Sequence, residues 1–435
     1  MISSFMSLPR LRLGAAPIVL LALTSSVVAQ TLPNIGDALR QLPAPTITPA
    51  PSLPLPAIGG QTLLEPALQT LPDDQPKIRI KSFTVLGNRF VSSSDLLALL
   101  ANEVDKDHSL SDMQALASRL TRYYRNQGYF VARVYVPAQE IQEGVLTLRA
   151  VEGNYGEFHL INASRVRDSV VQAMLDDVKT ANIVSLDTLE RAMLLIDDTP
   201  GAQVLRADVL PGTQVGTSDF EVETVATDPY SGLVTLDNHG SRYTGQNRMS
   251  FQLNANSPTG SGDHLALSGL ATGNGDLLNG RVAYALPLAP NGLRGEAAVS
   301  QTTYQLGDAY STLDAKGTAK ALDFSLSYPL RRTREQTVET SLGVSYKDLL
   351  DEILSTATRT PKSLASVTWG LSVRHESMVL GALGLTQGNL GLSLGSVNIR
   401  DASAAALDKS GANTQGQFTK ISANLSRMSL LPDAY

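Results

Sequence analysis

The C-terminal half of the chain is constrained most strongly by short runs in which apolar and polar residues alternate. These runs lie at residues 249–255, 321–328, 367–374 and 420–426. Successive side chains of a β-strand point to opposite faces, so each run predicts a strand with one apolar and one polar face. Turn-forming stretches such as residues 273–276 (Gly-Asn-Gly-Asp) separate the runs and predict hairpins. We therefore expect about ten antiparallel strands between Gly232 and Pro432.

Two all-β architectures fit such strands. In a soluble β-sandwich the apolar face packs on a second sheet, whereas in a membrane β-barrel it contacts lipid and the polar face lines the interior. The runs 293–306 and 336–353 are longer than the strands of ordinary sheets. Their length and the small polar residues of the second face favour the barrel.

The N-terminus has the three parts of a secretory signal peptide. Arg10 and Arg12 precede an apolar run over residues 17–28, and small residues lead to Ala29. This run is shorter than the roughly 20 residues that a membrane-spanning helix needs. We therefore expect residues 1–29 to be a signal peptide that is cleaved after Ala29, and the mature chain to be exported.

Residues 30–76 are expected to form a short helix and a proline-rich linker. Residues 34–42 have room for only a couple of helical turns, and six prolines follow between Pro43 and Pro56. A segment of this composition is extended and acts as a semi-rigid spacer.

Residues 77–153 have the pattern of a small α+β module. Ser111 is expected to cap a helix, with Gln114 completing a capping box, and Gly128 to end it in the left-handed conformation. A β-rich run over residues 129–136 follows. The remaining expected elements are strands at 78–86 and 144–152 and a helix at 94–101. The predicted order is β-α-α-β-β.

Residues 154–228 are expected to repeat this order. Ser185 is the predicted cap of the second helix, along which apolar residues keep helical spacing. The other expected elements are a strand at 157–161, a helix at 165–175 and strands at 202–210 and 220–227.

Three stretches resemble one known family. They are FTVLGNRFVSSSDLLALL, LTRYYRNQGYFVARVYVPAQEIQEGVLTLRAVEG and LDTLERAMLLIDDTPGAQVLRADVLPGTQVGTSDFEVE. They resemble the polypeptide-transport-associated (POTRA) domains of two-partner secretion transporters, the outer-membrane haemolysin secretion/activation proteins. The resemblance implies two periplasmic POTRA modules, 77–153 and 154–228, followed at 229–435 by a transmembrane β-barrel in a Gram-negative type of outer membrane.

The resemblance also implies a function and partners. Such a transporter of a type V secretion system recognises an unfolded exoprotein, such as a haemolysin or an adhesin, through its POTRA domains and translocates it through its barrel. Outer-membrane lipid and the barrel-assembly machinery, which inserts such barrels, would be further partners. The alternative is an outer-membrane β-barrel assembly factor, a class that shares these modules but usually carries more of them.

The sequence departs from the family pattern in two places. The family uses about sixteen strands and a loop with a VRG-aromatic motif, for which the nearest text here is Arg374-His375-Glu376. We therefore expect the barrel to be incomplete at the C-terminus, so that either the sequence is truncated or its product is not a working pore as it stands. The short helix at 34–42 would be either the plug that the family places in its barrel or part of a disordered periplasmic leader.

Nothing in the sequence predicts an enzyme. The chain has no cysteine, and its five histidines are scattered without metal-ligand spacing. It has no nucleophile elbow and no phosphate-binding loop, so we expect no catalytic, cofactor or metal site. A net charge of −6 and no dense basic run argue against nucleic-acid binding.

The first module holds the candidate partner-binding residues. An extended client is expected to add to the strand at 129–136 or to lie in the groove beside the helix at 111–126. Arginines of this region would steer an acidic client; the alternative is that they belong to a solvated helix face. The candidates are Arg119, Arg122, Arg125, Tyr129, Val131, Arg133 and Tyr135.

Overall fold

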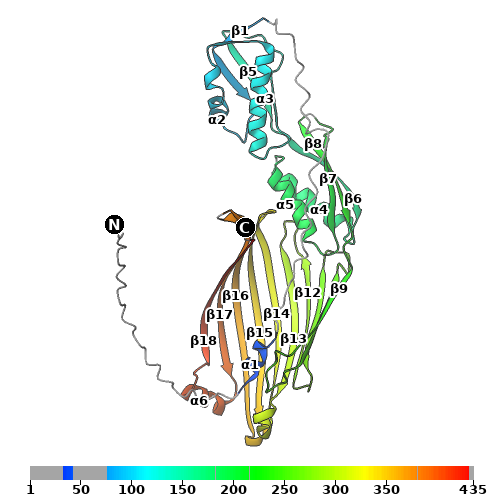
Figure 1. Ribbon diagram of the computed structural model, residues 1–435, viewed down its shortest axis with the longest axis vertical. Helices are drawn as coiled ribbons and strands as arrows, with labels where there is room; N and C mark the ends of the chain where they lie inside the picture. Colours follow the sequence, from blue (N-terminus) through cyan, green and yellow to red (C-terminus); the bar gives the residue numbers. More distant parts are fainter. Residues whose placement is uncertain (1–32, 43–75, 182, 215, 380, 431–435) are drawn as a thin grey trace, which may run out of the picture. The chain divides into compact units, whose positions relative to one another are not determined.

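A computed structural model describes residues 33–42, 76–181, 183–214, 216–379 and 381–430 (Figure 1). A short helix, two small α+β modules and a ten-stranded sheet follow one another along the chain. The predicted signal peptide and most of the predicted proline-rich linker lie outside the described residues.

The first module is built on a three-stranded sheet of order β2-β5-β4, in which β2 is parallel and β4 antiparallel to β5. Its core includes the fully buried Leu96, Leu120, Tyr124, Leu146 and Leu148. Its elements are β1 (Ile78–Ile80), β2 (Ser82–Leu86), α2 (Ser93–Ala98), β3 (Lys106–His108), α3 (Leu110–Asn126), β4 (Arg133–Tyr135) and β5 (Val145–Val151).

Two predicted strands of this module are wrong in extent. The run 78–86 is divided, because β1 pairs with β3 in a separate ladder while β2 joins the main sheet. The run 129–136 pairs only over Arg133–Tyr135, since Tyr129 and Val131 turn into hydrophobic cores instead of extending the strand.

Helix α3 begins at a different cap from the predicted Ser111. The Ser109 hydroxyl accepts a hydrogen bond from the Asp112 amide at 3.2 Å, and the Asp112 carboxylate accepts one from the Ser109 amide at 2.9 Å. The Ser109 amide and hydroxyl both donate to the Asp112 carboxylate, and these two bonds lower the pKa of Asp112. Strand β3 ends at His108, so the chain leaves the ladder one residue before this capping box and enters the helix directly. The predicted end is confirmed, since Gly128 has a φ of 89°.

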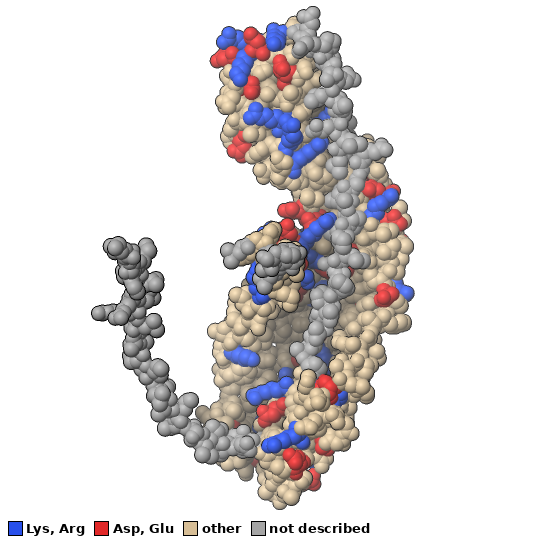
Figure 2. Space-filling model, in the orientation of Figure 1, with Lys and Arg blue, Asp and Glu red and all other residues tan. Residues whose placement is uncertain are grey.

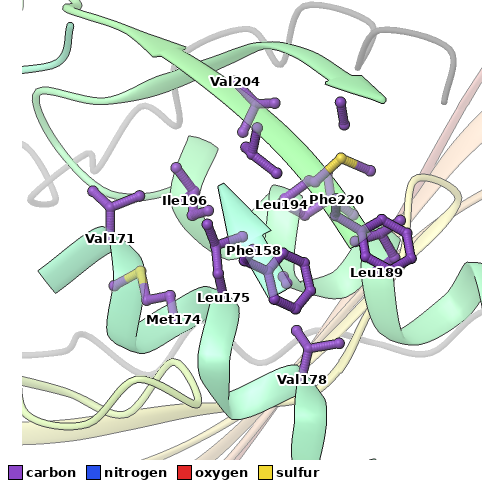
Figure 3. Close-up of a cluster of buried hydrophobic side chains, with 14 of the residues drawn as sticks. Phe158, Val171, Met174, Leu175, Val178, Leu189, Leu194, Ile196, Val204 and Phe220 are labelled. Carbon is purple, nitrogen blue, oxygen red and sulfur yellow. The ribbon is translucent and has the colours of Figure 1, made fainter. Parts of the chain in front are cut away.

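The second module repeats the arrangement with sheet order β6-β8-β7 and a parallel β6–β8 pair. The predicted cap is confirmed, because the Ser185 hydroxyl accepts from the Thr188 amide. Stacked Phe158 and Phe220, with ring centroids 5.2 Å apart, lie in the core together with Leu175 and Leu189 (Figure 3). The elements are β6 (Asn154–Ala163), α4 (Asp168–Asp177), α5 (Leu186–Asp197), β7 (Gln203–Pro211) and β8 (Thr217–Val225).

The C-terminal half forms one antiparallel sheet of ten strands in chain order, as predicted. Within the described residues β9 pairs only with β10 and β18 only with β17, so the sheet is open. Its strands are β9 (Tyr230–Asp237), β10 (Arg248–Asn256), β11 (His264–Thr272), β12 (Leu277–Pro287), β13 (Arg294–Gln305), β14 (Ala315–Arg332), β15 (Gln336–Ile353), β16 (Thr358–Val379), β17 (Ala382–Ile399) and β18 (Gly416–Ser429).

The two faces of this sheet differ in chemistry. One row of laterally paired residues, Phe324, Val344, Val367 and Leu394, is apolar, and these side chains are 44–53% exposed. A row on the opposite face consists of Ser341, Gly370, Gly391 and Ser422. A large exposed apolar face fits lipid rather than water, and so favours the barrel type of sheet over the sandwich.

Among the described residues, none of the helices has both the length and the apolar character that a membrane crossing requires.

Candidate functional site

The seven candidate residues of the first module lie on different sides of it. Arg119 and Arg122 are on the exposed side of α3, over which basic side chains gather (Figure 2), while Arg125 is partly buried. Tyr129 packs on the first core, edge-to-face with Tyr124 at 6.2 Å, and Val131 packs on the core of the second module. Arg133 and Tyr135 are exposed on β4, on the face opposite to the buried Val134. The structure therefore does not join the seven into one surface.

The outer edge of β4 is closed by a side chain. The Thr121 hydroxyl of α3 accepts a hydrogen bond from the Val134 amide at 2.9 Å and lies 3.3 Å from the Val134 carbonyl oxygen. Just beyond β4, the side-chain amide of Gln139 donates to the Thr147 carbonyl at 2.7 Å and accepts from the Thr147 amide at 3.0 Å. An added strand would have to displace these groups, so the predicted strand addition at 129–136 has no free edge there.

The other face of this sheet is open to solvent. Leu86, Arg149 and Tyr135 are laterally paired across its three strands, and Arg133 lies opposite Val151. Leu86 is 53% exposed and Tyr135 38% exposed. Because the helices cover only the opposite face, these residues form a surface of β2, β5 and β4 that we call the open sheet face.

A buried carboxylate fixes the loop after β2. Glu152 is 7% exposed and accepts hydrogen bonds from the amides of Arg89 (2.8 Å) and Phe90 (3.1 Å) and from the Tyr124 hydroxyl (3.0 Å). Burial and the bond to Glu152 raise the pKa of Tyr124, so its hydroxyl keeps the proton that it donates. Glu152 could not be found from the sequence, because no local pattern distinguishes it from a surface glutamate.

Backbone hydrogen bonds join the two modules. The Gly128 carbonyl accepts from the Leu186 amide at 3.0 Å, at the start of α5, and the Gly153 carbonyl accepts from the Val184 amide at 3.2 Å. Gly153 has a φ of 81°, and a Cβ there would lie 2.5 Å from the Val131 side chain. The predicted helix-ending Gly128 therefore also contributes to the module junction.

The second module contacts the turns of the ten-stranded sheet through α5. Asp198, at the end of α5, receives two hydrogen bonds from Arg332, at 2.7 and 2.9 Å. The Arg191 guanidinium donates to the Pro329 carbonyl at 2.8 Å, and Glu190 accepts from the Arg334 amide at 2.9 Å. Residues up to 144 positions apart in the sequence thus hold this module to the β14–β15 turn.

The carboxyl group of Asp197, beside this contact, has a shifted pKa. Burial raises the pKa of Asp197 to about 6, although its Oδ1 atom accepts from the Val204 amide at 2.6 Å. Protons bind more readily in the folded state, so the second module should gain stability as the pH falls from about 6 to the ordinary value of 3.8. The gain is about 2 kcal/mol once the partial exposure of Asp197 is allowed for.

Asp197→Asn tests this pH dependence. The variant keeps an acceptor for the Val204 amide and removes the charge. We therefore expect α5 and β7 to be more stable at neutral pH, and their stability to depend less on pH below neutral. Hydrogen exchange of the full chain, corrected for intrinsic exchange rates, measures both. The exposed Asp187→Asn is the control; an identical pH profile in wild type and Asp197→Asn would contradict the assignment.

Helix α1 (Ile35–Arg40) lies against the polar face of β13, β14 and β15. Its first amide, of Ile35, donates to Asp351 at 2.9 Å, and beyond its end the Gln41 carbonyl accepts from Arg248 at 2.9 Å. Ile35 and Ala38 are each 2% exposed. The packing favours the plug over the disordered leader as the interpretation of residues 34–42.

Three charged side chains on the polar face form a network of ion pairs. Arg281 bonds to Glu296 at 2.9 Å and to Asp323 at 3.2 Å, across β12, β13 and β14. In the part of the chain that the structure describes, no group of three or more His, Cys, Asp or Glu residues is arranged to hold a metal ion.

Comparison with known families gives two matches. The model of the POTRA domain, ShlB-type, matches residues 78–153. The model of the haemolysin secretion/activation protein ShlB/FhaC/HecB matches residues 216–434, which is half of the chain.

Individual relatives agree with these matches. The heme/hemopexin transporter protein HuxB of Haemophilus influenzae (strain 86-028NP) is 27% identical over 95% of this chain and 73% of that protein. The outer membrane transporter CdiB of Escherichia coli is 23% identical over 80% of this chain and 56% of that protein. The solved structure of CdiB from Escherichia coli shares the fold, with a TM-score of 0.65 at 20% identity over 92% of this chain and 71% of that chain. The chain therefore belongs to the haemolysin secretion/activation protein ShlB/FhaC/HecB family, the outer-membrane transporters of two-partner secretion with POTRA domains in the periplasm.

Proposed function

We propose that this transporter recognises one unfolded exoprotein through its POTRA modules and passes it along the polar face of its sheet to the cell surface, without ATP. Residues 77–153 and 154–228 are the two modules, and the sheet from residue 229 onward is the translocating part. The exoprotein is the secreted partner, lipid surrounds the apolar face, and the barrel-assembly machinery inserts the sheet.

The observation that carries this proposal is the two-sided sheet. Its apolar rows suit lipid, whereas the row Ser341, Gly370, Gly391 and Ser422 is small and uncharged. Small polar side chains leave space beside the wall and offer only weak contacts to a passing chain. Helix α1 occupies the same face, near Asp351 and Arg248, and would have to leave or shift before a client could pass.

The family match favours a transporter over the barrel-assembly factor, since the matching model describes secretion and activation proteins.

Disulfide trapping tests the path, because the chain has no cysteine of its own. When a mild thiol oxidant is added, Ser341→Cys, on the polar face, is expected to form a disulfide with an exoprotein that carries one cysteine and is arrested during secretion. Leu342→Cys is the matched control, since Leu342 is the next residue and its side chain lies on the apolar face, 48% exposed. Trapping at both positions, or at neither, would contradict the proposed path.

A further inference from the structure

We propose that the open sheet face of the first module, centred on Arg149, is the surface that binds an acidic, aromatic-containing segment of the exoprotein. The inference deepens the proposed function and rests on it. It places recognition on the sheet side of the module rather than on α3 or on the edge of β4.

The backbone groups on the β4 side of the sheet already have hydrogen-bond partners. The Thr121 hydroxyl and the Gln139 side-chain amide already satisfy the backbone groups of Val134 and Thr147 on the β4 side. Leaving such groups without partners costs about 1–3 kcal/mol each. A client therefore gains little from backbone pairing at β4, so on this side of the sheet its affinity must come from side-chain contacts.

The open sheet face is positively charged. The side chains that alternate to this face along β2, β4 and β5 include no acidic residue. Arg133 and Arg149 are exposed on it, and neither forms an ion pair within the described residues. By contrast, Arg119 of α3 lies 4.0 Å from Glu103. The open sheet face thus offers two arginines whose charges are not neutralised by the module.

Apolar side chains flank Arg149 and form what we call its apolar frame. Arg149 has Leu86 on one side and Tyr135 on the other in the same lateral row. An arginine between an aliphatic and an aromatic side chain suits a carboxylate whose neighbours are aromatic or aliphatic, because both the charge and the apolar surface find partners. The whole chain carries a net charge of −6, so it repels polyanions in general and binding depends on this local surface.

The experiment measures binding of a synthetic peptide to the detergent-solubilised full chain. The probe is a fluorescein-labelled repeat of Gly-Asp-Tyr-Glu, followed by fluorescence anisotropy at low and high salt. We expect salt-sensitive binding that falls at least about tenfold in Arg133→Glu/Arg149→Glu. The matched variant Arg119→Glu/Arg122→Glu, with the same charge change on α3, should lose less than about twofold.

Other results would overturn the inference. These are equal losses in the two double variants, absence of peptide binding, and binding of anionic lipid vesicles in place of the peptide. Leu86→Ala/Tyr135→Ala should weaken binding without changing its salt dependence, which separates the apolar frame from the charges. If the peptide does not bind but removal of residues 78–153 still abolishes secretion, only the placement of the binding surface is refuted. If the peptide binds but removal of residues 78–153 leaves secretion unaltered, the proposed receptor role is refuted.

Discussion

Removal of residues 78–153 is expected to abolish secretion of the exoprotein while the ten-stranded sheet still reaches the outer membrane. The first module has a core of its own, and the sheet satisfies its hydrogen bonds through neighbouring strands. Loss of the module therefore removes a binding surface without removing any strand of the sheet. Exoprotein in the medium and the amount of transporter in purified outer membranes measure the two effects.

The deletion also uncovers the part of the second core on which Phe130 and Val131 pack. Arg133→Glu/Arg149→Glu changes only exposed side chains and keeps the module folded, so it should lower secretion without uncovering this core. The receptor role is wrong if secretion is unaltered after the deletion. If secretion ceases but the transporter is also missing from the membrane, assembly rather than recognition has failed.

Replacement of Glu152 by alanine is expected to destabilise the first module by about 3–5 kcal/mol. The change leaves the amides of Arg89 and Phe90 and the Tyr124 hydroxyl without their acceptor in a site that is 7% exposed. Each buried unsatisfied donor costs about 1–3 kcal/mol. A loss of this size approaches the whole stability of a small domain.

Hydrogen exchange over residues 76–153 of the full chain measures this loss. Glu152→Gln keeps one acceptor oxygen and should lie between alanine and wild type. Glu140→Ala removes an exposed carboxylate and is the matched control, for which we expect less than about 0.5 kcal/mol. Equal protection in Glu152→Ala and Glu140→Ala would show that the buried carboxylate has no structural role.

The secondary structure was predictable where the signal is local. Helical spacing placed α3 and α5, Ser185 marked the start of α5, and alternation of polar and apolar residues set the strand number of the sheet. The cap of α3 was misplaced because Ser109 and Ser111 carry the same hydroxyl group. The β1–β3 ladder, a pairing between distant residues, ends at His108 and so brings Ser109 to the start of the helix, where Asp112 completes its capping box.

The candidate site was predictable only as a region. The run 129–136 has high β-propensity throughout, yet Tyr129 and Val131 each face a different core, and one of these cores belongs to the next module. Contacts such as Asp198 with Arg332, separated by 134 residues, leave no trace in local sequence. The closure of β4 by Thr121 depends on side-chain geometry that no pattern of residue types encodes.

The closed edge of β4 has a consequence for selectivity. Backbone pairing is blind to sequence, so an open strand edge would accept many of the unfolded polypeptides that travel through the periplasm to other destinations. With Thr121 and Gln139 bonded to those backbone groups, a passing chain can bind at the edge of β4 only through its side chains. The edge of β4 therefore does not bind unfolded polypeptides in general, and retention there depends on side chains that match those of the module.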